Sequence, residues 1–418
     1  MTLRKVLLIA YHFPPIQGST GTSRTIAFSR YLQDNGWDVR ILTIRTDAYQ
    51  DTSSENEGLI PPHVQVERAW GLDTRRSLSI LGRYPMILAL PDRWQSWIAG
   101  GFFKGSKIIR SWRPDIIMSS YPIASAHAIA YLLQRRFRLP WVAEFRDPML
   151  QPNYPTTASE RWAFSRVETL VFSNAQRVIT TTDGCRRMYL ERFPDWEKSR
   201  IETISNGYDP AAFPEVATVP LEKIRDRLVL LHSGLLYSYE RNPTAFFSAV
   251  RSLREHGFLV DKNVEFRFRA SGNDECYRDT VTKLGIQEYV SFLPRVSYLK
   301  AVEEMRVVDA LMLFQADNCN DQIPAKTYEY LYAQKPVLGF TDPEGETGKL
   351  LLSVGIRSVA KLEDSAEIEN QIVTFVNQLR KNAAFVVPKA VASQFSRETQ
   401  TADLSRVLSE ALAEHSRS

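Results

Sequence analysis

Two carboxylates eight positions apart, Asp321 and Glu329, flank a loop that leads into a helix. Pro324 fits the start of that helix, because proline has a fixed φ and no N–H to leave unbonded. Free N–H groups at a helix start attract phosphate. The pattern indicates a diphosphate at the helix tip near Lys326, ribose hydroxyls on Glu329, and the hydroxyls of a sugar on Asp321. The alternative is an acid at the helix start and another on its solvated face.

The apolar run 228–232 leads into Ser233 and Gly234, and a cation, Arg241, follows further along the chain. Arg241 opens the next helix, where a cation opposes the helix dipole. We expect Arg241 to stabilise the charge that develops on a leaving diphosphate. Its alternative role is a plain surface charge.

The first strand, Val6–Ala10, is followed directly by His12 and then by a glycine-rich loop, Gly18–Gly21. Glycines at Gly18 and Gly21 let the backbone approach a ligand. We expect this loop to contact the donor diphosphate or the acceptor; the alternative is a tight turn without a ligand.

The buried run Trp141–Phe145 ends in Arg146 and Asp147, and residues at the carboxyl end of a parallel strand face the ligand. Asp147 can orient an acceptor hydroxyl or pair with Arg146. His127 can bind acceptor or phosphate, although a lone histidine is more often buried and structurally satisfied.

Short apolar runs alternate with amphipathic helices, and this rhythm restarts at Leu228, which predicts two α/β units with parallel sheets. Turn-forming residues between 206 and 225, including Pro214 and Pro220, predict the junction. We therefore expect domains at 1–212 and 225–385, followed by a helical tail at 386–418 that packs back on the first domain.

Composition narrows the class of protein. A net charge of +4 over 418 residues does not favour nucleic-acid binding. Cys185, Cys276 and Cys319 form no metal-binding cluster, and their scatter suits a reducing compartment, so we expect a cytoplasmic protein without a metal. Basic residues recur every three positions between Lys104 and Arg113, which indicates either a helix lying peripherally on the inner membrane or an ordinary surface helix.

The segment 321–338 resembles the E-x7-E region of family 4 retaining glycosyltransferases, which have the GT-B fold. The loop at Gly18–Gly21 with Arg24, the Asn206–Asp209 turn, and Ser271–Gly272 follow the order of that family's elements. One departure is Leu235, where the family usually has an arginine. A second is Arg146–Asp147, where many members have a histidine.

The resemblance implies two Rossmann-like doubly wound domains facing a central cleft. It implies a nucleotide-sugar donor on Gly234, Gly272, Pro324, Lys326 and Glu329, and a saccharide or lipid-linked acceptor near Arg24 and His127. Arg241, Asp321, Arg146 and Asp147 would serve catalysis. Surface polysaccharide or lipopolysaccharide assembly is the implied setting. A nucleotide-sugar 2-epimerase and a catalytically silent nucleotide-sugar-binding partner stay open as alternatives.

Overall fold

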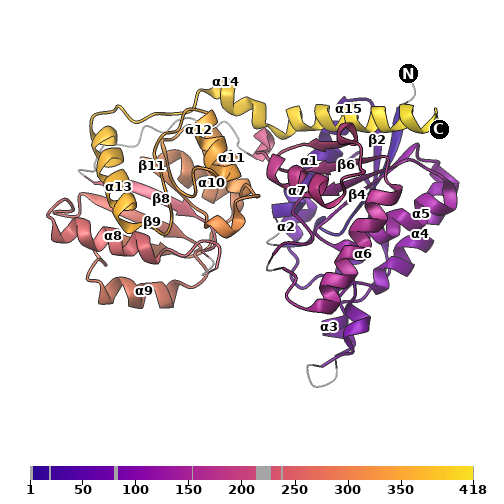
Figure 1. Ribbon diagram of the computed structural model, residues 1–418, viewed down its shortest axis with the longest axis horizontal. Helices are drawn as coiled ribbons and strands as arrows, with labels where there is room; N and C mark the ends of the chain where they lie inside the picture. Colours follow the sequence, from indigo (N-terminus) through magenta and orange to yellow (C-terminus); the bar gives the residue numbers. More distant parts are fainter. Residues whose placement is uncertain are drawn as a thin grey trace. The chain divides into compact units, whose positions relative to one another are not determined.

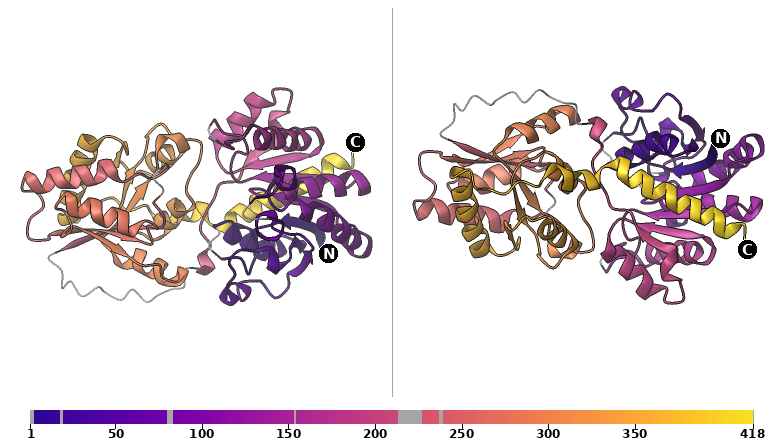
Figure 2. Two further views of the ribbon diagram at one scale, coloured as in Figure 1. Left: turned by 90° about the horizontal axis from the view of Figure 1, so that it is seen from below. Right: turned by 90° about the horizontal axis from the view of Figure 1, so that it is seen from above.

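The computed structural model describes residues 3–17, 20–79, 83–152, 154–212, 227–236 and 239–417. The chain divides into two compact units (Figures 1 and 2). Unit 1 comprises residues 1–205 and 397–418, and unit 2 comprises residues 206–396. Unit 1 is therefore discontinuous in sequence, and the chain passes between the units twice. The junction expected at 206–225 begins where this division falls, and residues 213–226 lie outside the described part.

Unit 1 is built on a seven-stranded parallel sheet in the order β3-β2-β1-β4-β5-β6-β7. Apolar residues fill the central strands because helices cover both faces of the sheet. The strands are β1 (Arg4–Ala10), β2 (Trp37–Ile44), β3 (Gln65–Ala69), β4 (Ile116–Ser120), β5 (Trp141–Phe145), β6 (Arg177–Thr180) and β7 (Ile201–Thr203).

The two faces of β1 enter different cores. Leu7 and Ile9 pack with Trp97 and Ile129, whereas Val6 and Leu8 pack on the opposite face. The helices of unit 1 are α1 (Thr20–Asp34), α2 (Ser54–Glu57), α3 (Thr74–Ser77), α4 (Ser96–Trp112), α5 (Ala124–Phe137), α6 (Ala158–Asn174), α7 (Asp183–Arg192) and α15 (Arg397–His415), with 3-10 turns η1 (Thr46–Ala48), η2 (Met86–Ala89) and η3 (Lys198–Arg200).

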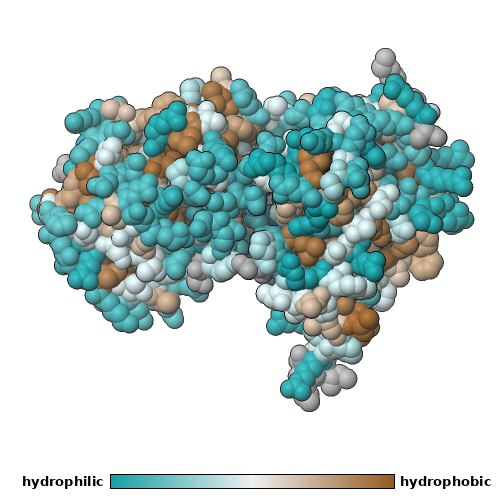
Figure 3. Space-filling model, viewed as in Figure 1, coloured by the Kyte–Doolittle hydropathy of each residue, from teal (hydrophilic) through white to brown (hydrophobic). Residues whose placement is uncertain are grey.

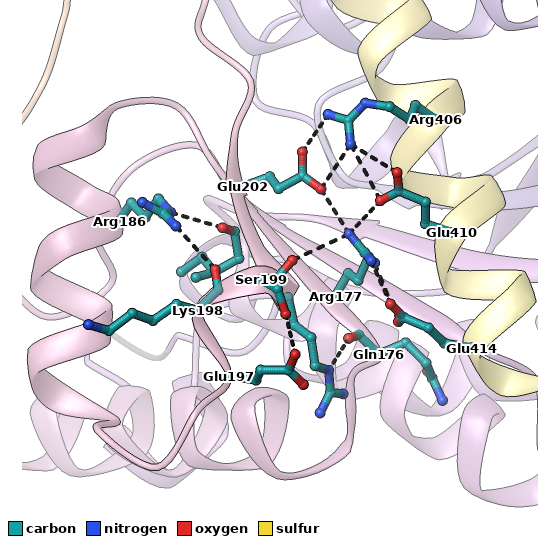
Figure 4. A network of polar contacts seen from close by, with 12 residues as sticks. Gln176, Arg177, Arg186, Glu197, Lys198, Ser199, Glu202, Arg406, Glu410 and Glu414 are labelled. Atoms are coloured by element: carbon teal, nitrogen blue, oxygen red, sulfur yellow. Dashed lines mark hydrogen bonds and ion pairs between the residues drawn. The ribbon is translucent and has the colours of Figure 1, made fainter. Parts of the chain in front are cut away.

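The last helix, α15, packs beside α1 and completes the second core of unit 1 with Leu404, Val407 and Leu408 (Figure 1). Ion pairs hold its polar side to the sheet (Figure 4). Arg177 of β6 contacts Glu202 at 2.8 Å, Glu410 at 2.7 Å and Glu414 at 2.5 Å. The C-terminal segment is thus a structural part of unit 1.

Unit 2 has a six-stranded parallel sheet in the order β10-β9-β8-β11-β12-β13. Its strands are β8 (Leu228–Ser233), β9 (Val264–Arg269), β10 (Val290–Leu293), β11 (Ala310–Phe314), β12 (Val337–Phe340) and β13 (Val359–Ala360). Its helices are α8 (Thr244–Glu255), α9 (Asp274–Lys283), α10 (Tyr298–Val307), α11 (Ala325–Tyr332), α12 (Glu346–Ser353), α13 (Ser365–Arg380) and α14 (Lys389–Ala392), with turns η4 (Pro210–Ala212), η5 (Asp317–Cys319) and η6 (Ser393–Phe395).

Both sheets reverse their strand order next to the first strand of the unit, between β1 and β4 and between β8 and β11. Loops that leave the carboxyl ends of strands on either side of such a point diverge and leave a crevice for a ligand. The topology therefore directs attention to the residues that follow these four strands.

Candidate active site

The loop after β11 is held in place by its own buried polar contacts. Gln315 is 3% exposed, and its Nε2 donates to the carbonyls of Cys319 at 2.8 Å and Gln322 at 2.9 Å. Thr347 Oγ1 also donates to the Gln322 carbonyl, at 3.1 Å. These bonds hold the backbone of the loop that carries Asp321, whose side chain is exposed.

Helix α11 follows this loop, and Pro324 is its N-cap residue rather than its first helical residue, since Pro324 has ψ 134°. The expected start is therefore shifted by one residue, to Ala325. Glu329 lies one turn inside the helix and is half-buried. The Tyr298 hydroxyl donates to Glu329 Oε1 at 2.9 Å, so the carboxylate is held beside α10 and is not turned out to bulk solvent.

Lys326 points from α11 toward the end of β8. A Cβ added to Gly234 would lie 2.5 Å from Lys326 Nζ, so only glycine leaves room for the ammonium group there. Gly234 also has φ +125°, which favours glycine. Burial, with a contribution from Arg241, lowers the pKa of Lys326 to about 7.

His232 is fully buried under this ammonium group. Its Nδ1 lies 3.0 Å from the Met312 carbonyl, which can only accept, so Nδ1 carries the proton. Nε2 is then an acceptor, 3.4 Å from Lys326 Nζ. Burial and the charge of Lys326 lower the pKa of His232 well below its usual value, so the ring is neutral.

Arg241 and Gly272 both lie beside Leu235, just after the end of β8. Arg241 Nη1 donates to the Leu235 carbonyl at 3.3 Å. Gly272 has φ +89°, and a Cβ there would lie 2.8 Å from a methyl group of Leu235. The carboxyl edge of unit 2 thus brings together two cations, a carboxylate and two glycines.

The corresponding edge of unit 1 brings together Gly21, Arg146 and His12. A Cβ on Gly21 would collide with the Arg146 guanidinium, which therefore lies directly over the glycine. Burial, followed by the charge of Arg146, lowers the pKa of His12 to about 3. Burial also raises the pKa of the neighbouring Asp147, with Arg146 acting in the opposite direction.

Arg24 is only 1% exposed, and its guanidinium is occupied within unit 1. Nε donates to Glu144 at 2.8 Å, Nη1 to the Ser205 carbonyl at 2.6 Å, and Nη2 to the Ile204 carbonyl at 2.8 Å. Glu144 also accepts from Ser120 at 2.6 Å. Burial alone would raise the pKa of Glu144, but Arg24 and Ser120 outweigh it and lower that pKa.

His127 is 0% exposed in α5, and its Nδ1 lies 2.7 Å from Ser119 Oγ. Burial lowers the pKa of His127 to about 3. Arg24 and His127 therefore lie in the core, where neither reaches a ligand without rearrangement. Gly18, also expected to bind donor, lies outside the described residues.

Comparison with known proteins relates one unit to a described family. Residues 21–207 match the family described as glycosyl transferase 4-like domain, a stretch that covers most of unit 1. Unit 1 is thus similar to a glycosyl transferase 4-like domain. The match confirms the predicted enzyme class, a glycosyltransferase. A search of curated protein sequences finds no match.

Solved structures confirm the GT-B fold predicted for the whole chain. Sucrose-phosphate synthase from Thermosynechococcus elongatus superposes with a TM-score of 0.70 at 12% identity, covering 98% of this chain and 100% of its own. HepE from Anabaena, solved with UDP and glucose, gives 0.66 at 16% identity, with 97% and 99% covered. A UDP-GlcNAc 2-epimerase from Neisseria meningitidis gives 0.57 at 11% identity, with 97% and 100% covered.

Sequence reasoning missed several residues that support the two edges. In unit 1 these are Ser120, the last residue of β4, and Glu144, next to the last residue of β5. In unit 2 they are His232, Tyr298 and Tyr330, whose hydroxyl accepts from the Ser233 N–H at 2.9 Å. A polar residue at the end of an apolar strand, such as His232, was the available signal.

Proposed function

We propose that this chain transfers a sugar, with retention of anomeric configuration, from a nucleoside diphosphate sugar to a saccharide or lipid-linked acceptor. The observation that carries the proposal is the placement of Lys326, Arg241 and Glu329 around the start of α11. Cations beside a helix start suit a diphosphate, and a half-buried carboxylate suits the two hydroxyls of a ribose. HepE, which has the same fold, was solved with UDP-glucose.

In the proposed mechanism, the donor lies on unit 2. Its diphosphate contacts Lys326, Arg241 and the N–H groups at the start of α11, which stabilise negative charge as the glycosidic bond breaks. The anionic ligand raises the pKa of Lys326, so the ammonium form binds. Lys326 thereby provides a cation at the end of β8, where this chain has Leu235 in place of the arginine that the family usually has.

The acceptor is proposed to lie on the edge of unit 1 formed by Gly21, Arg146 and Asp147. Asp147 would orient the acceptor hydroxyl, and Arg146 is already positioned over Gly21. Asp321 would receive hydroxyls of the transferred sugar. We propose no ligand contact for Arg24 or His127, since both are buried. From the family resemblance we propose a cytoplasmic role in assembling surface polysaccharide or lipopolysaccharide, without a metal.

The decisive experiment is a thermal-shift screen of nucleotide sugars, followed by transfer assays with the stabilising donor. Transfer to a saccharide or lipid-linked acceptor, with the donor's anomeric configuration in the NMR spectrum of the product, is expected. No stabilisation by any nucleotide sugar would refute the proposal.

A 2-epimerase is the second candidate, because epimerase structures share the fold. It predicts an epimerised donor in the absence of any acceptor. Binding without turnover across all acceptors would instead favour a catalytically silent partner.

A further inference from the structure

Unit 1 carries an exposed apolar surface that its core does not use. Met86, Ile87 and Leu88 of η2 are exposed, Ile87 to 69%, and Phe103 of α4 is exposed to 72%. A groove beside them is lined by Leu78, Leu88, Ile98, Phe102, Phe103 and Leu132. Figure 3 shows hydrophobic side chains gathered on the part of unit 1 that Figure 1 labels α3. We call this set, Leu78, Met86–Leu88, Phe103 and Leu132, the apolar patch.

The apolar patch is held in a defined conformation. Thr74 Oγ1 donates to the Leu88 carbonyl at 2.6 Å, and the Thr74 N–H donates to the Arg93 carbonyl at 2.8 Å. These bonds tie α3 to the segment that carries η2. The apolar face of α4 itself is used in the core, through Trp97, Ile108 and Trp112. Of the α4 side chains only the exposed Phe103 belongs to the apolar patch, and the other members come from η2, α5 and the residue after α3.

Basic side chains continue the apolar patch along α4 and α5. Phe103, Lys107 and Arg110 follow one another at helical spacing on the exposed face of α4. Arg135 and Arg136 are exposed on the neighbouring α5, which packs against α4. Arg110 and Arg136 both lie over the Phe137 ring, at 5.8 and 5.5 Å, so the two rows meet.

Acidic residues are nearly absent from this part of the sequence. Residues 74–113 contain eight lysines and arginines but one acid, Asp92. That carboxylate is used internally, since it accepts from Ser125 N at 2.7 Å and Ser125 Oγ at 2.9 Å. Apolar residues beside a basic, acid-poor face match the surface of an anionic bilayer, which offers both acyl chains and negative headgroups.

We propose that the apolar patch and the basic rows of α4 and α5 dock unit 1 on an anionic lipid bilayer, with Ile87 and Phe103 entering the headgroup region. Two weak attractions, apolar and electrostatic, together give stable but reversible binding. The segment from β3 to α4 lies at the carboxyl edge of the sheet, the edge that carries Gly21 and Arg146. Docking there would deliver a lipid-linked acceptor to that edge. This consequence depends on the proposed function, whereas the docking itself does not.

The test is co-sedimentation of the full chain with phosphatidylglycerol-containing vesicles and with pure phosphatidylcholine vesicles. Binding to the anionic vesicles alone is expected, weakened by 0.5 M salt. Lys107→Gln with Arg110→Gln should weaken partitioning by roughly twenty-five-fold, at about fivefold for each of the two basic residues. Ile87→Ser with Phe103→Ser should weaken it at least about tenfold.

Matched controls are Leu299→Ser, at an exposed leucine of α10, and Lys349→Gln with Lys381→Gln, at exposed lysines of unit 2. These should bind vesicles as the wild type does. Donor affinity, measured in parallel, should be unchanged in every variant, which separates this proposal from the proposed function. Wild-type protein that stays in the supernatant would overturn the proposal, as would unchanged binding by Ile87→Ser with Phe103→Ser. A concentration-dependent dimer lost in those variants, without vesicle binding, would assign the patch to a second copy of the chain.

Discussion

At the scale of single residues, Glu329 carries the clearest prediction. Glu329→Ala should weaken nucleotide-sugar binding by about 1–3 kcal/mol, because ribose hydroxyls would lose a charged acceptor. Isothermal titration calorimetry measures this directly. Glu275→Ala, at an exposed acid of α9, is the matched control. Equal affinities for the two variants would remove Glu329 from the donor site.

The lowered pKa of Lys326 predicts that donor binding depends on pH. Its pKa is about 7 in the unliganded protein, and a bound diphosphate raises that pKa. The protonated form binds better, so affinity should be constant below about pH 7 and should fall at higher pH, by up to about tenfold per unit. A nucleotide sugar is the correct probe, because free nucleoside diphosphates titrate near the same pH.

The control for this titration is Lys326→Met, which should bind weakly but without pH dependence between about pH 7 and 9. If the wild type and Lys326→Met show the same slope, another group is responsible.

Arg241 is predicted to act on turnover. Arg241→Ala should lower kcat by roughly 100-fold, because charge on the leaving diphosphate is greatest in the transition state. Donor affinity should change less than about tenfold. Arg251→Ala, which removes an exposed ion pair within α8, is the control for general effects on stability. A normal kcat in Arg241→Ala would exclude the residue from the mechanism.

At the scale of elements, the docking of α15 depends on Arg177. This residue is 7% exposed and faces Glu202, Glu410 and Glu414 (Figure 4). Arg177→Ala should lower the free energy of unfolding of unit 1 by about 1–3 kcal/mol, because three carboxylates would lose their shared cation. Urea denaturation measures this change.

Arg406→Ala provides the comparison within the same network. Arg406 contacts Glu202 at 2.5 Å, but its side chain is 49% exposed. Exposed pairs contribute little, so this variant should lose less than about 1 kcal/mol. The reverse ranking would show that the burial of Arg177 does not control the docking.

At the scale of the whole molecule, the two units are expected to respond separately to the donor. All eight tryptophans, Trp37, Trp70, Trp94, Trp97, Trp112, Trp141, Trp162 and Trp196, lie in unit 1. Nucleotide sugar at about 100 times its Kd should stabilise unit 2 by about 2.7 kcal/mol. When the protein is unfolded with the donor present, far-UV circular dichroism should therefore show a second transition, in which unit 2 unfolds after unit 1. The unfolding midpoint measured by tryptophan fluorescence should not change. A tryptophan midpoint that rises equally would show that the units unfold together or that donor binds unit 1.

Part of the fold could be predicted from the sequence, and part could not. The alternation of apolar runs with amphipathic helices was visible in the sequence. Among the described residues, no helix has the length and apolar character needed to span a membrane. Runs such as Val6–Ala10 and Leu228–His232 show the alternation because burial on both faces demands apolar residues at consecutive positions. The edge strand β3 escaped notice because its residues, Gln65–Ala69, are mostly polar and only partly buried.

The sequence by itself therefore determined the doubly wound architecture, the enzyme class through resemblance, and the loop–helix segment that carries Asp321 and Glu329. Tertiary structure alone decided which polar groups meet. It placed Lys326 against His232, 94 positions away, and it occupied Arg24 with Glu144, 120 positions away. Periodicity and turn chemistry are local properties, whereas the partner of a buried charge depends on contacts between distant segments.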